Sequence, residues 1–203
     1  MRVGGIVLCG GESKRMGRPK AWLPFGNETM LVRVCRILGD VVSPIVVVAA
    51  PSQQVPPLPP SVRLVYDEEK GRGPLQGLAA GLEELTGHAD AAFVSSCDVP
   101  FLKPAFVRRM IDLLGANQIC VIKTENLFHP LAAVYRLEVK DSVRKLLAEH
   151  RLRPAFLFDE LPTRVVTAAE VASADPDLLS LQNVNTPEAY DEALRRAGLS
   201  SSC

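Results

Sequence analysis

Short apolar runs recur along the first two thirds of the chain, and most of them are rich in β-branched residues. They cover residues 3–9, 44–50, 62–65, 91–97 and 119–122, with a weaker run at 131–135. Most of the runs are almost continuously apolar and lack the alternation that marks a strand with one face in water. This pattern is typical of strands that a parallel sheet buries on both faces.

Between the runs, apolar side chains return every three or four positions, as on a helix with one buried face. The spacing predicts helices over residues 30–38, 75–85, 106–114 and 139–147. A final helix is expected after Thr186, which can cap a helix with Pro187 at its first position. Because strands and helices alternate over roughly the first 120 residues, we expect a single doubly wound α/β domain. Such a domain has a mostly parallel central sheet with helices on both faces.

Composition and charge narrow the class of protein. The 203 residues carry no repeat and no linker to a second domain, and Lys+Arg and Asp+Glu number 23 each. A net charge of zero removes the main argument for nucleic-acid binding, which depends on a basic excess. No apolar stretch approaches the roughly 20 residues of a bilayer span, and the N-terminus lacks a cleavage signal. We therefore expect no membrane association and a cytoplasmic location.

Two further features have both a structural and a functional interpretation. Residues 55–60 hold four prolines, which form either a ligand for a polyproline-binding domain or a stiff connection between two strands. The predicted strands on either side favour the connection. The cysteines are widely spaced and form no C-x-x-C pair, which argues against a disulfide framework or a zinc site and indicates buried thiols. They are Cys9, Cys35, Cys97, Cys120 and Cys203.

The segment after the first predicted strand, residues 9–20, combines glycines with cations. The glycines, which let the backbone approach a ligand closely, are Gly10, Gly11 and Gly17. The cations are Lys14, Arg15, Arg18 and Lys20. Backbone N–H groups beside cations form a site for a polyanion, above all a phosphate chain. The P-loop and G-x-G-x-x-G patterns do not match this spacing, and the remaining alternative is a flexible turn with solvated charges.

Two other predicted strands end in an acid. Asp67 closes the strand that begins at residue 62, and Asp98 follows the strand at 91–97. Ligands of open α/β sheets bind beyond the carboxyl ends of the strands, so both acids are expected in the same crevice as the cationic loop. A carboxylate beside phosphates is repulsive unless a cation lies between them, and Mg²⁺ prefers one or two carboxylates plus phosphate oxygens. An acid that only caps the next helix is the alternative for each.

Together these segments resemble the nucleotidyltransferase family that includes molybdenum cofactor guanylyltransferase. The similarity rests on L-C-G-G-x-S-x-R-M-G-x-x-K from Leu8 to Lys20, L-P-x-G at 23–26, G-P-L-x-G at 73–77 and C-D-V-P at 97–100. It continues with Asp67, His129-Pro130 and N-V-N-T-P at 183–187, and so spans nearly the whole chain.

The resemblance implies a Rossmann-like nucleotidyltransferase fold and a reaction. GMP passes from GTP to phosphorylated, molybdenum-loaded molybdopterin, with Mg²⁺ as cofactor, and pyrophosphate leaves. Residues 1–120 are expected to form the NTP-binding half and residues 121–203 the acceptor-binding half. Molybdoenzymes or their chaperones are the implied protein partners.

Site roles follow from the same resemblance. Arg15 and Lys20 are expected to neutralise the β- and γ-phosphates, and Asp98 is expected to hold Mg²⁺. The residues expected to contact the nucleotide are Leu8, Cys9, Gly10, Gly11, Lys20, Asp67, Gly73, Pro74 and Asp98. Those expected to contact the acceptor are His129, Arg151, Arg153, Asn183 and Asn185. No general base is assigned, because a phosphate nucleophile is already ionised at neutral pH.

Several alternatives stay open. The Asn segment at 183–185 can be an Asx turn before the last helix, the two arginines a solvated helix end, and His129 a structural histidine. Guanylyl members of the family often carry an Asn near the end of the second strand, and residues 46–50 contain none, so that contact is missing or supplied by backbone. Gly10-Gly11 favours guanine, since cytidylyl relatives tend to carry Ala-Ala-Gly. The alternative functions are cytidylyl transfer, transfer to a phosphorylated sugar or alcohol, and a non-catalytic nucleotide or cofactor carrier.

Overall fold

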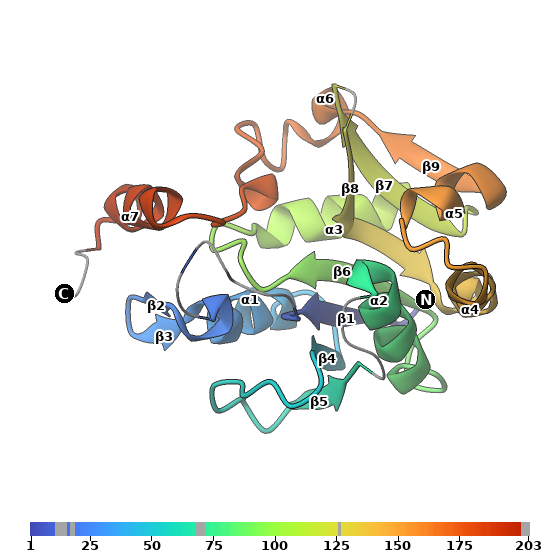
Figure 1. Ribbon diagram of the computed structural model, residues 1–203. Coiled ribbons are helices and arrows are strands. Elements are labelled where there is room, and N and C mark those ends of the chain that lie inside the picture. Colours follow the sequence, from blue (N-terminus) through green and yellow to red (C-terminus); the bar gives the residue numbers. More distant parts are fainter. Residues whose placement is uncertain (11–15, 17–18, 68–71, 126, 200–203) are drawn as a thin grey trace.

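The computed structural model describes residues 1–10, 16, 19–67, 72–125 and 127–199. Its centre is a seven-stranded sheet with the order β5-β4-β1-β6-β8-β7-β9 (Figure 1). The strands are β1 (Val3–Leu8), β4 (Ile45–Ala49), β5 (Val62–Tyr66), β6 (Ala91–Ser96), β7 (Ile119–Thr124), β8 (Leu127–Arg136) and β9 (Thr163–Val166). All neighbours run parallel except β8, which is antiparallel to β6 and β7. The predicted α/β class with a mostly parallel sheet is confirmed.

The order of the strands creates a topological switch point beside β1. The chain adds β4 and β5 on one side of β1 and then places β6 on the other side. At such a point the connections leave neighbouring strands in opposite directions, which opens a crevice at their carboxyl ends. Cys9 and Gly10 follow β1 at this point, and Asp98 follows β6.

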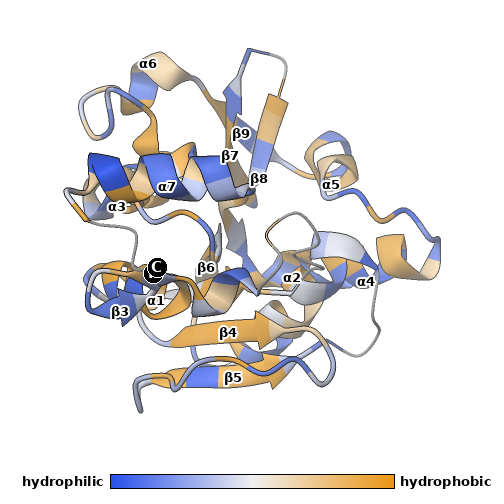
Figure 2. Ribbon diagram, turned by 60° about the vertical axis from the view of Figure 1, so that its left-hand side comes forward, coloured by the Kyte–Doolittle hydropathy of each residue, from blue (hydrophilic) through white to orange (hydrophobic). Residues whose placement is uncertain are grey.

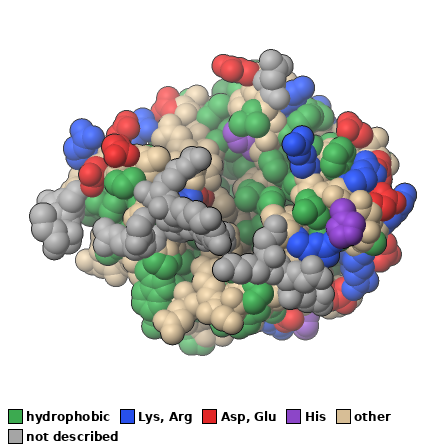
Figure 3. Space-filling model, in the orientation of Figure 1, with side chains coloured by type: hydrophobic (Ala, Val, Ile, Leu, Met, Phe, Trp, Pro, Cys, Tyr) green, Lys and Arg blue, Asp and Glu red, His purple; other side chains and the backbone are tan. Residues whose placement is uncertain are grey.

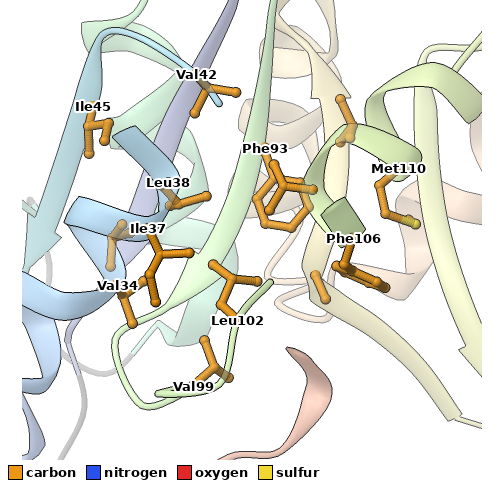
Figure 4. Packing of buried hydrophobic residues seen from close by; sticks show 14 of the residues in the cluster. Val34, Ile37, Leu38, Val42, Ile45, Phe93, Val99, Leu102, Phe106 and Met110 are labelled. Atoms are coloured by element: carbon orange, nitrogen blue, oxygen red, sulfur yellow. The ribbon is translucent and has the colours of Figure 1, made fainter. Parts of the chain in front are cut away.

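Helices cover both faces of the sheet. One face carries α1 (Met30–Gly39), α3 (Pro104–Leu113) and α6 (Ala168–Val171), and the other carries α2 (Gly73–Glu84), α4 (Lys140–Ala148) and α5 (Ala155–Glu160). On the first face, Phe93 of β6 meets Phe106 of α3 edge to face, with ring centroids 6.4 Å apart (Figure 4). β4 is hydrophobic along its length (Figure 2), because its side chains divide between the two cores.

A smaller core beside the sheet supports the C-terminal segment. The hairpin of β2 (Pro24–Phe25) and β3 (Glu28–Thr29) packs with α7 (Pro187–Arg196), and Val184 is buried among them. Thr186 caps α7, since its hydroxyl accepts a hydrogen bond from the Ala189 N–H at 3.2 Å. The Tyr190 hydroxyl donates to the Pro24 carbonyl. Residues 183–185 are therefore held between this small core and the main sheet.

The hydrophobic pattern missed the shortest elements. It predicts neither β9, the β2–β3 hairpin, α5 nor α6, and it misses the 3-10 helices Lys20–Trp22, Leu137–Val139 and Leu179–Leu181. β8 begins at Leu127, so His129 lies within the strand and not ahead of it. Pro130 is tolerated there because the register between β7 and β8 shifts, which frees its position from the ladder.

The structure confirms the expectations for residues 55–60 and for four of the cysteines. Residues 55–60 connect β4 to β5, as the predicted strands on either side suggest. Cys203 lies outside the described residues, and the other four cysteines are buried free thiols. Within the described ranges, no helix combines the length and the apolarity needed to cross a membrane.

Close packing of α2 on β1 leads to a first testable prediction. A Cβ at Gly81 would lie 2.7 Å from Ile6 Cγ2, inside the buried interface of helix and strand. We expect overpacking in Gly81→Ala to lower the free energy of unfolding by about 1–3 kcal/mol. The higher helix propensity of Ala offsets roughly 1 kcal/mol of this loss. Gly39→Ala is the matched control, because its Cβ would meet Ile45 Cδ1 at an ordinary 3.6 Å. Thermal melts should show a lower midpoint for Gly81→Ala than for Gly39→Ala, and equal midpoints for the two variants would rule out the tight contact.

Candidate active site

The carboxyl ends of β1, β4, β5 and β6 lie at one edge of the sheet and carry several of the predicted nucleotide-binding residues. Leu8 ends β1, and Cys9 and Gly10 begin the turn after it. Asp67 follows β5, and Asp98 follows β6. The strand-end rule therefore places both acids at the same edge as the predicted phosphate-binding turn.

The turn after β1 is described only in part. Gly11 and Arg15 lie outside the described residues, so the contacts expected of them stay predictions. Cys9 is buried, and burial raises the pKa of its thiol to about 12, so this side chain is neutral. At Cys9 and Gly10 it is therefore the backbone that the turn offers to a ligand.

Asp98 is the centre of a hydrogen-bonded cluster at the switch point. Lys20 Nζ donates to Asp98 Oδ2 at 2.7 Å and also donates to Asn185 Oδ1. Asn183 Nδ2 donates to Asp98 Oδ1 at 2.7 Å and to Ser96 Oγ at 3.1 Å. Asp98 is only 6% exposed, and both of its carboxylate oxygens are satisfied by these groups. A buried charge paired in this way is held in a fixed orientation.

The backbone of residues 183–185 is positioned so that both Asn side chains reach the cluster around Asp98. The Val184 N–H donates to the Asp98 carbonyl at 2.8 Å, and the Val184 side chain packs in the small core beside α7. The amides on either side of it contact Asp98 and Lys20. Thr186, and not an Asn, caps the following helix. The segment thus presents two amides to one site and is not an Asx cap.

Asp67 lies close to both Gly10, after β1, and Gly77 of the helix α2. A Cβ at Gly10 would lie 3.7 Å from Asp67 Oδ2, and a Cβ at Gly77 would lie 3.4 Å from Asp67 Oδ1. Oδ1 is buried and has no hydrogen-bond partner in the described part of the chain. Burial raises the pKa of this carboxyl to about 6. A buried acceptor without a donor costs free energy, which a ligand that brings N–H groups would offset.

A side chain that the sequence motifs do not reveal bonds to the backbone just before Gly10. Gln53, in the connection after β4, donates from Nε2 to the Cys9 carbonyl at 2.9 Å. Its Oε1 accepts from the Ala50 N–H at 3.0 Å. Ser96, which accepts from the side chain of Asn183, was also missed. A lone Gln in a loop or a Ser in a strand has no spacing that would single it out.

Gly73 and Pro74 start α2. Gly73 has a φ of 71°, a left-handed conformation that favours glycine, and the proline occupies the first turn of the helix. A Cβ at Gly73 would lie 4.0 Å from the Leu152 carbonyl. The start of α2 therefore lies against the segment between α4 and α5, which carries Arg151 and Arg153.

Of the residues predicted to contact the acceptor, Asn183 and Asn185 alone join the Asp98 cluster. His129 lies in β8, where its Nε2 shares a hydrogen bond of 2.7 Å with Thr124 Oγ1. The ring is half-buried, and burial lowers its pKa, which favours the neutral imidazole at pH 7. It can act there as a hydrogen-bonding group but not as a fixed cation.

The two arginines assigned to the acceptor lie on a charged part of the surface, between α4 and α5. Arg151 pairs with Glu149 at 3.2 Å and with Glu160 at 2.5 Å, and it stacks over the Phe156 ring at 4.5 Å. Arg153 is exposed. Figure 3 shows side chains of both signs gathered on the right of the view, over α4 and α5. The structure thus brings neither arginine to the Asp98 cluster, and their contacts with the acceptor stay predictions.

The described residues can help to hold a metal ion but do not enclose one. They contain no group of three or more His, Cys, Asp or Glu side chains arranged to bind a metal. An ion at Asp98 would therefore need oxygens from its substrate, as Mg²⁺ commonly has. The donors fit such a cation, because Asp98 Oδ2 and Asn185 Oδ1 already converge on the ammonium group of Lys20.

Comparison with known sequences agrees with this geometry. Residues 5–164 match the family model of the MobA-like NTP transferase domain. A probable molybdenum cofactor guanylyltransferase of Mycobacterium avium (strain 104) is 35% identical over 201 residues, which cover 97% of each chain. A molybdenum cofactor guanylyltransferase of Desulfosudis oleivorans is 33% identical over 193 residues, which cover 94% of each chain.

Solved structures share the fold. Molybdopterin-guanine dinucleotide biosynthesis protein A from Archaeoglobus fulgidus superposes with a TM-score of 0.79 at 19% identity, over 96% of this chain and 98% of that one. A 4-diphosphocytidyl-2C-methyl-D-erythritol synthase from Anaerococcus prevotii superposes with a TM-score of 0.68 at 13% identity, over 97% and 98%. With the strand-end motifs in place and the family model matching residues 5–164, this chain belongs to the MobA-like NTP transferase family.

Proposed function

We propose that this nucleotidyltransferase transfers GMP from GTP to phosphorylated, molybdenum-loaded molybdopterin and releases pyrophosphate. Relatives at 33% and 35% identity over nearly the full length carry the name molybdenum cofactor guanylyltransferase. The observation that carries the proposal is the placement of two groups along one sheet edge. One is the buried oxygen of Asp67, which has no hydrogen-bond partner among the described residues, and the other is the ion-paired cluster around Asp98.

The two groups are placed to suit the two ends of a nucleoside triphosphate. Asp67 follows β5 and Asp98 follows β6, and the order of the sheet puts β4 and β1 between these two strands. A Cβ at Gly10 would lie 3.7 Å from Asp67 Oδ2, so the backbone at Cys9 and Gly10 lies at the Asp67 end, where it can face the nucleoside.

Guanine is the base that complements Asp67 best. Its Watson–Crick edge carries two neighbouring donors, N1–H and the N2 amino group, whereas cytosine and adenine place an amino group beside an acceptor nitrogen. An ionised carboxylate accepts hydrogen bonds and donates none, so it can pair with both guanine donors at once. The low-dielectric surroundings that raise the pKa of Asp67 also strengthen such bonds.

The reaction asks the protein for positioning and charge neutralisation. An oxygen of the acceptor phosphate bonds to the α-phosphorus of GTP as the bond to the pyrophosphate oxygen breaks, so the two groups must be held in line. Lys20 would leave Asp98 and neutralise the departing pyrophosphate. No residue needs to remove a proton, because the acceptor phosphate is ionised at neutral pH.

Mg²⁺ is the proposed cofactor, held by Asp98 and by the amide oxygen of Asn185. When bound, it supplies Lewis-acid stabilisation of the charge on the phosphate oxygens. Asn183 would keep its hydrogen bond to Asp98 Oδ1 and so fix the direction in which the carboxylate faces. This positioning is analogous to the outer hydrogen bonds that orient ligands in known metal sites.

On the acceptor side, Asn183 and Asn185 are proposed to border the phosphate of molybdopterin as well as to hold the cluster. His129 is proposed to contact the pterin as a neutral hydrogen-bonding partner. Arg151 and Arg153 stay proposed contacts of the acceptor. Arg151 would first have to exchange its two glutamate partners for the acceptor.

Titration of Asp67 gives a second testable prediction. The pKa of this carboxyl is about 6 in the free protein, and only its ionised form accepts from both guanine donors. The Kd of GTP should therefore rise about tenfold per pH unit below 6, until the lower pKa of the complex is reached. ATP is the control, since its phosphates titrate alike, and its Kd should change less. Calorimetric titrations that give GTP and ATP the same pH slope would contradict the role of Asp67.

Pyrophosphate release tests the proposed reaction. The protein is incubated with Mg²⁺, molybdopterin and each of GTP, CTP, ATP and UTP in turn. Release is expected with GTP, and it should require both molybdopterin and the metal. Release with CTP, or with a phosphorylated sugar in place of molybdopterin, would assign the chain to a different nucleotidyl transfer. Nucleotide binding without release, whichever acceptor is offered, would indicate a carrier.

A further inference from the structure

The backbone hydrogen-bond ladder between β1 and β4 stops at the edge of the sheet where the nucleotide is proposed to bind. The two strands are paired from Gly5 with Ile45 to Leu8 with Val48, and the Cys9 N–H still donates to the Val48 carbonyl at 2.9 Å. In a regular parallel ladder, the next bond would run from the N–H two positions beyond Val48 to the Cys9 carbonyl.

That bond is replaced by a side chain. The amide of Gln53 lies between the two backbone groups, accepting from the Ala50 N–H at 3.0 Å and donating to the Cys9 carbonyl at 2.9 Å. The Gln53 N–H also donates to the Ala50 carbonyl at 3.0 Å, which closes the turn that carries it. The strand ends are therefore bridged by an amide plane and do not bond to each other directly.

The bridge fixes the peptide that faces Asp67. The Cys9 carbonyl is the last backbone acceptor before Gly10, so the hydrogen bond from Gln53 sets the rotation of the Cys9–Gly10 peptide. A Cβ at Gly10 would lie 3.4 Å from the Ala50 nitrogen and 3.7 Å from Asp67 Oδ2. The peptide held by Gln53 therefore lies at the Asp67 end of the edge, and Lys20 pairs with Asp98 at the other.

We propose that Gln53 is a positioning residue for the nucleoside half of the triphosphate substrate. Its amide keeps the ends of β1 and β4 apart and holds the Cys9–Gly10 peptide where the nucleoside meets it and Asp67. The inference rests on the proposed function for the identity of the nucleotide. It adds that the nucleoside and the phosphates are held by separable parts of the site, and that Gln53 serves the first part alone.

Gln53→Met tests the inference, because it keeps the length of the side chain and removes both hydrogen bonds. Gln54→Met is the matched control: its side chain is exposed, and the Gln54 carbonyl that accepts from Trp22 Nε1 is unchanged. With Mg²⁺ present, we expect Gln53→Met to raise the Kd of GTP about 10- to 30-fold, the loss of one to two positioned hydrogen bonds. The Kd of inorganic triphosphate should stay within about twofold, and Gln54→Met should change neither value.

A role limited to folding would give a different result. If Gln53 only stabilised the edge of the sheet, GTP and inorganic triphosphate would weaken together, and that outcome overturns the inference. An unchanged Kd for GTP overturns it as well. Gln53→Glu is a second variant, in which one oxygen can still accept from the Ala50 N–H but the other repels the Cys9 carbonyl. Its effect on GTP should be at least as large as that of Gln53→Met.

Turnover adds a further distinction. At saturating GTP, Gln53→Met should keep kcat within about threefold while the KM for GTP rises with the Kd, since only ground-state placement of the nucleoside is lost. Because the main comparison is one of binding, it is independent of the acceptor. A wild-type protein that binds GTP and transfers nothing would refute the proposed reaction, while the two dissociation constants would still decide the role of Gln53.

Discussion

Asp98→Asn is expected to lower kcat for GMP transfer by about 10²–10³-fold, the typical cost of one lost electrostatic contact to a transferring group. The amide keeps the shape of the side chain and can still bond to Asn183, but it removes the charge that Lys20 pairs with at 2.7 Å. With that charge gone, the site would lose the carboxylate ligand that we propose for Mg²⁺. Steady-state pyrophosphate release at several Mg²⁺ concentrations measures the effect.

Asp141→Asn is the control for this variant, because Asp141 lies on α4 with its side chain 82% exposed and only a 3.7 Å contact to Arg144. It should keep wild-type turnover. A thermal melt of Asp98→Asn shows whether the fold survives the change. Wild-type turnover by a folded Asp98→Asn protein would remove this carboxylate from the reaction.

Asp67→Asn is expected to weaken GTP binding by roughly 100-fold, near 3 kcal/mol, because one of its two acceptors becomes an amino group that faces a guanine donor. The same change should stabilise the free protein at neutral pH. Burial raises the pKa of Asp67 to about 6, so the ionised carboxylate is disfavoured in the folded state. The free energy of unfolding therefore falls as pH rises from the unfolded pKa of about 4 to the folded value.

The asparagine variant lacks this titration, so the two proteins should be equally stable near pH 4 and should diverge up to pH 7. With partial solvent exposure allowed for, the gap at pH 7 is of the order of 1 kcal/mol, or about 2–4 °C in Tm. Paired melts across this range measure it. A variant less stable than wild type at pH 7, or one that binds GTP normally, would contradict the proposal that Asp67, whose Oδ1 has no partner among the described residues, accepts hydrogen bonds from the base.

Much of the framework could be predicted from the apolar pattern, because strands buried on both faces leave uninterrupted runs. β1, β4 and β6 match their predicted runs to within one residue at each end. β9 could not be predicted in the same way, because its four residues include Thr163 and Arg164, and its pairing with β7 depends on tertiary contact.

The site likewise contains residues that the sequence predicts and residues that it does not. The strand-end rule locates Asp67 and Asp98 from the sequence alone, since each acid lies at the end of a predicted strand. The roles of Lys20 and of the Asn segment came from the family resemblance, and they meet Asp98 only through packing of distant segments. The position of Gln53 in the site could not be predicted, because its hydrogen bonds join the ends of two strands that are far apart in the sequence.

A crystal structure of the protein with GTP and Mg²⁺ is the most direct test of how the edge of this sheet holds its ligand. The Watson–Crick edge of guanine should lie within hydrogen-bonding distance of the Asp67 carboxylate, with the triphosphate on Lys20 and the metal on Asp98. Nucleotide bound elsewhere, or bound while the ion pair between Lys20 and Asp98 stays intact, would contradict that arrangement.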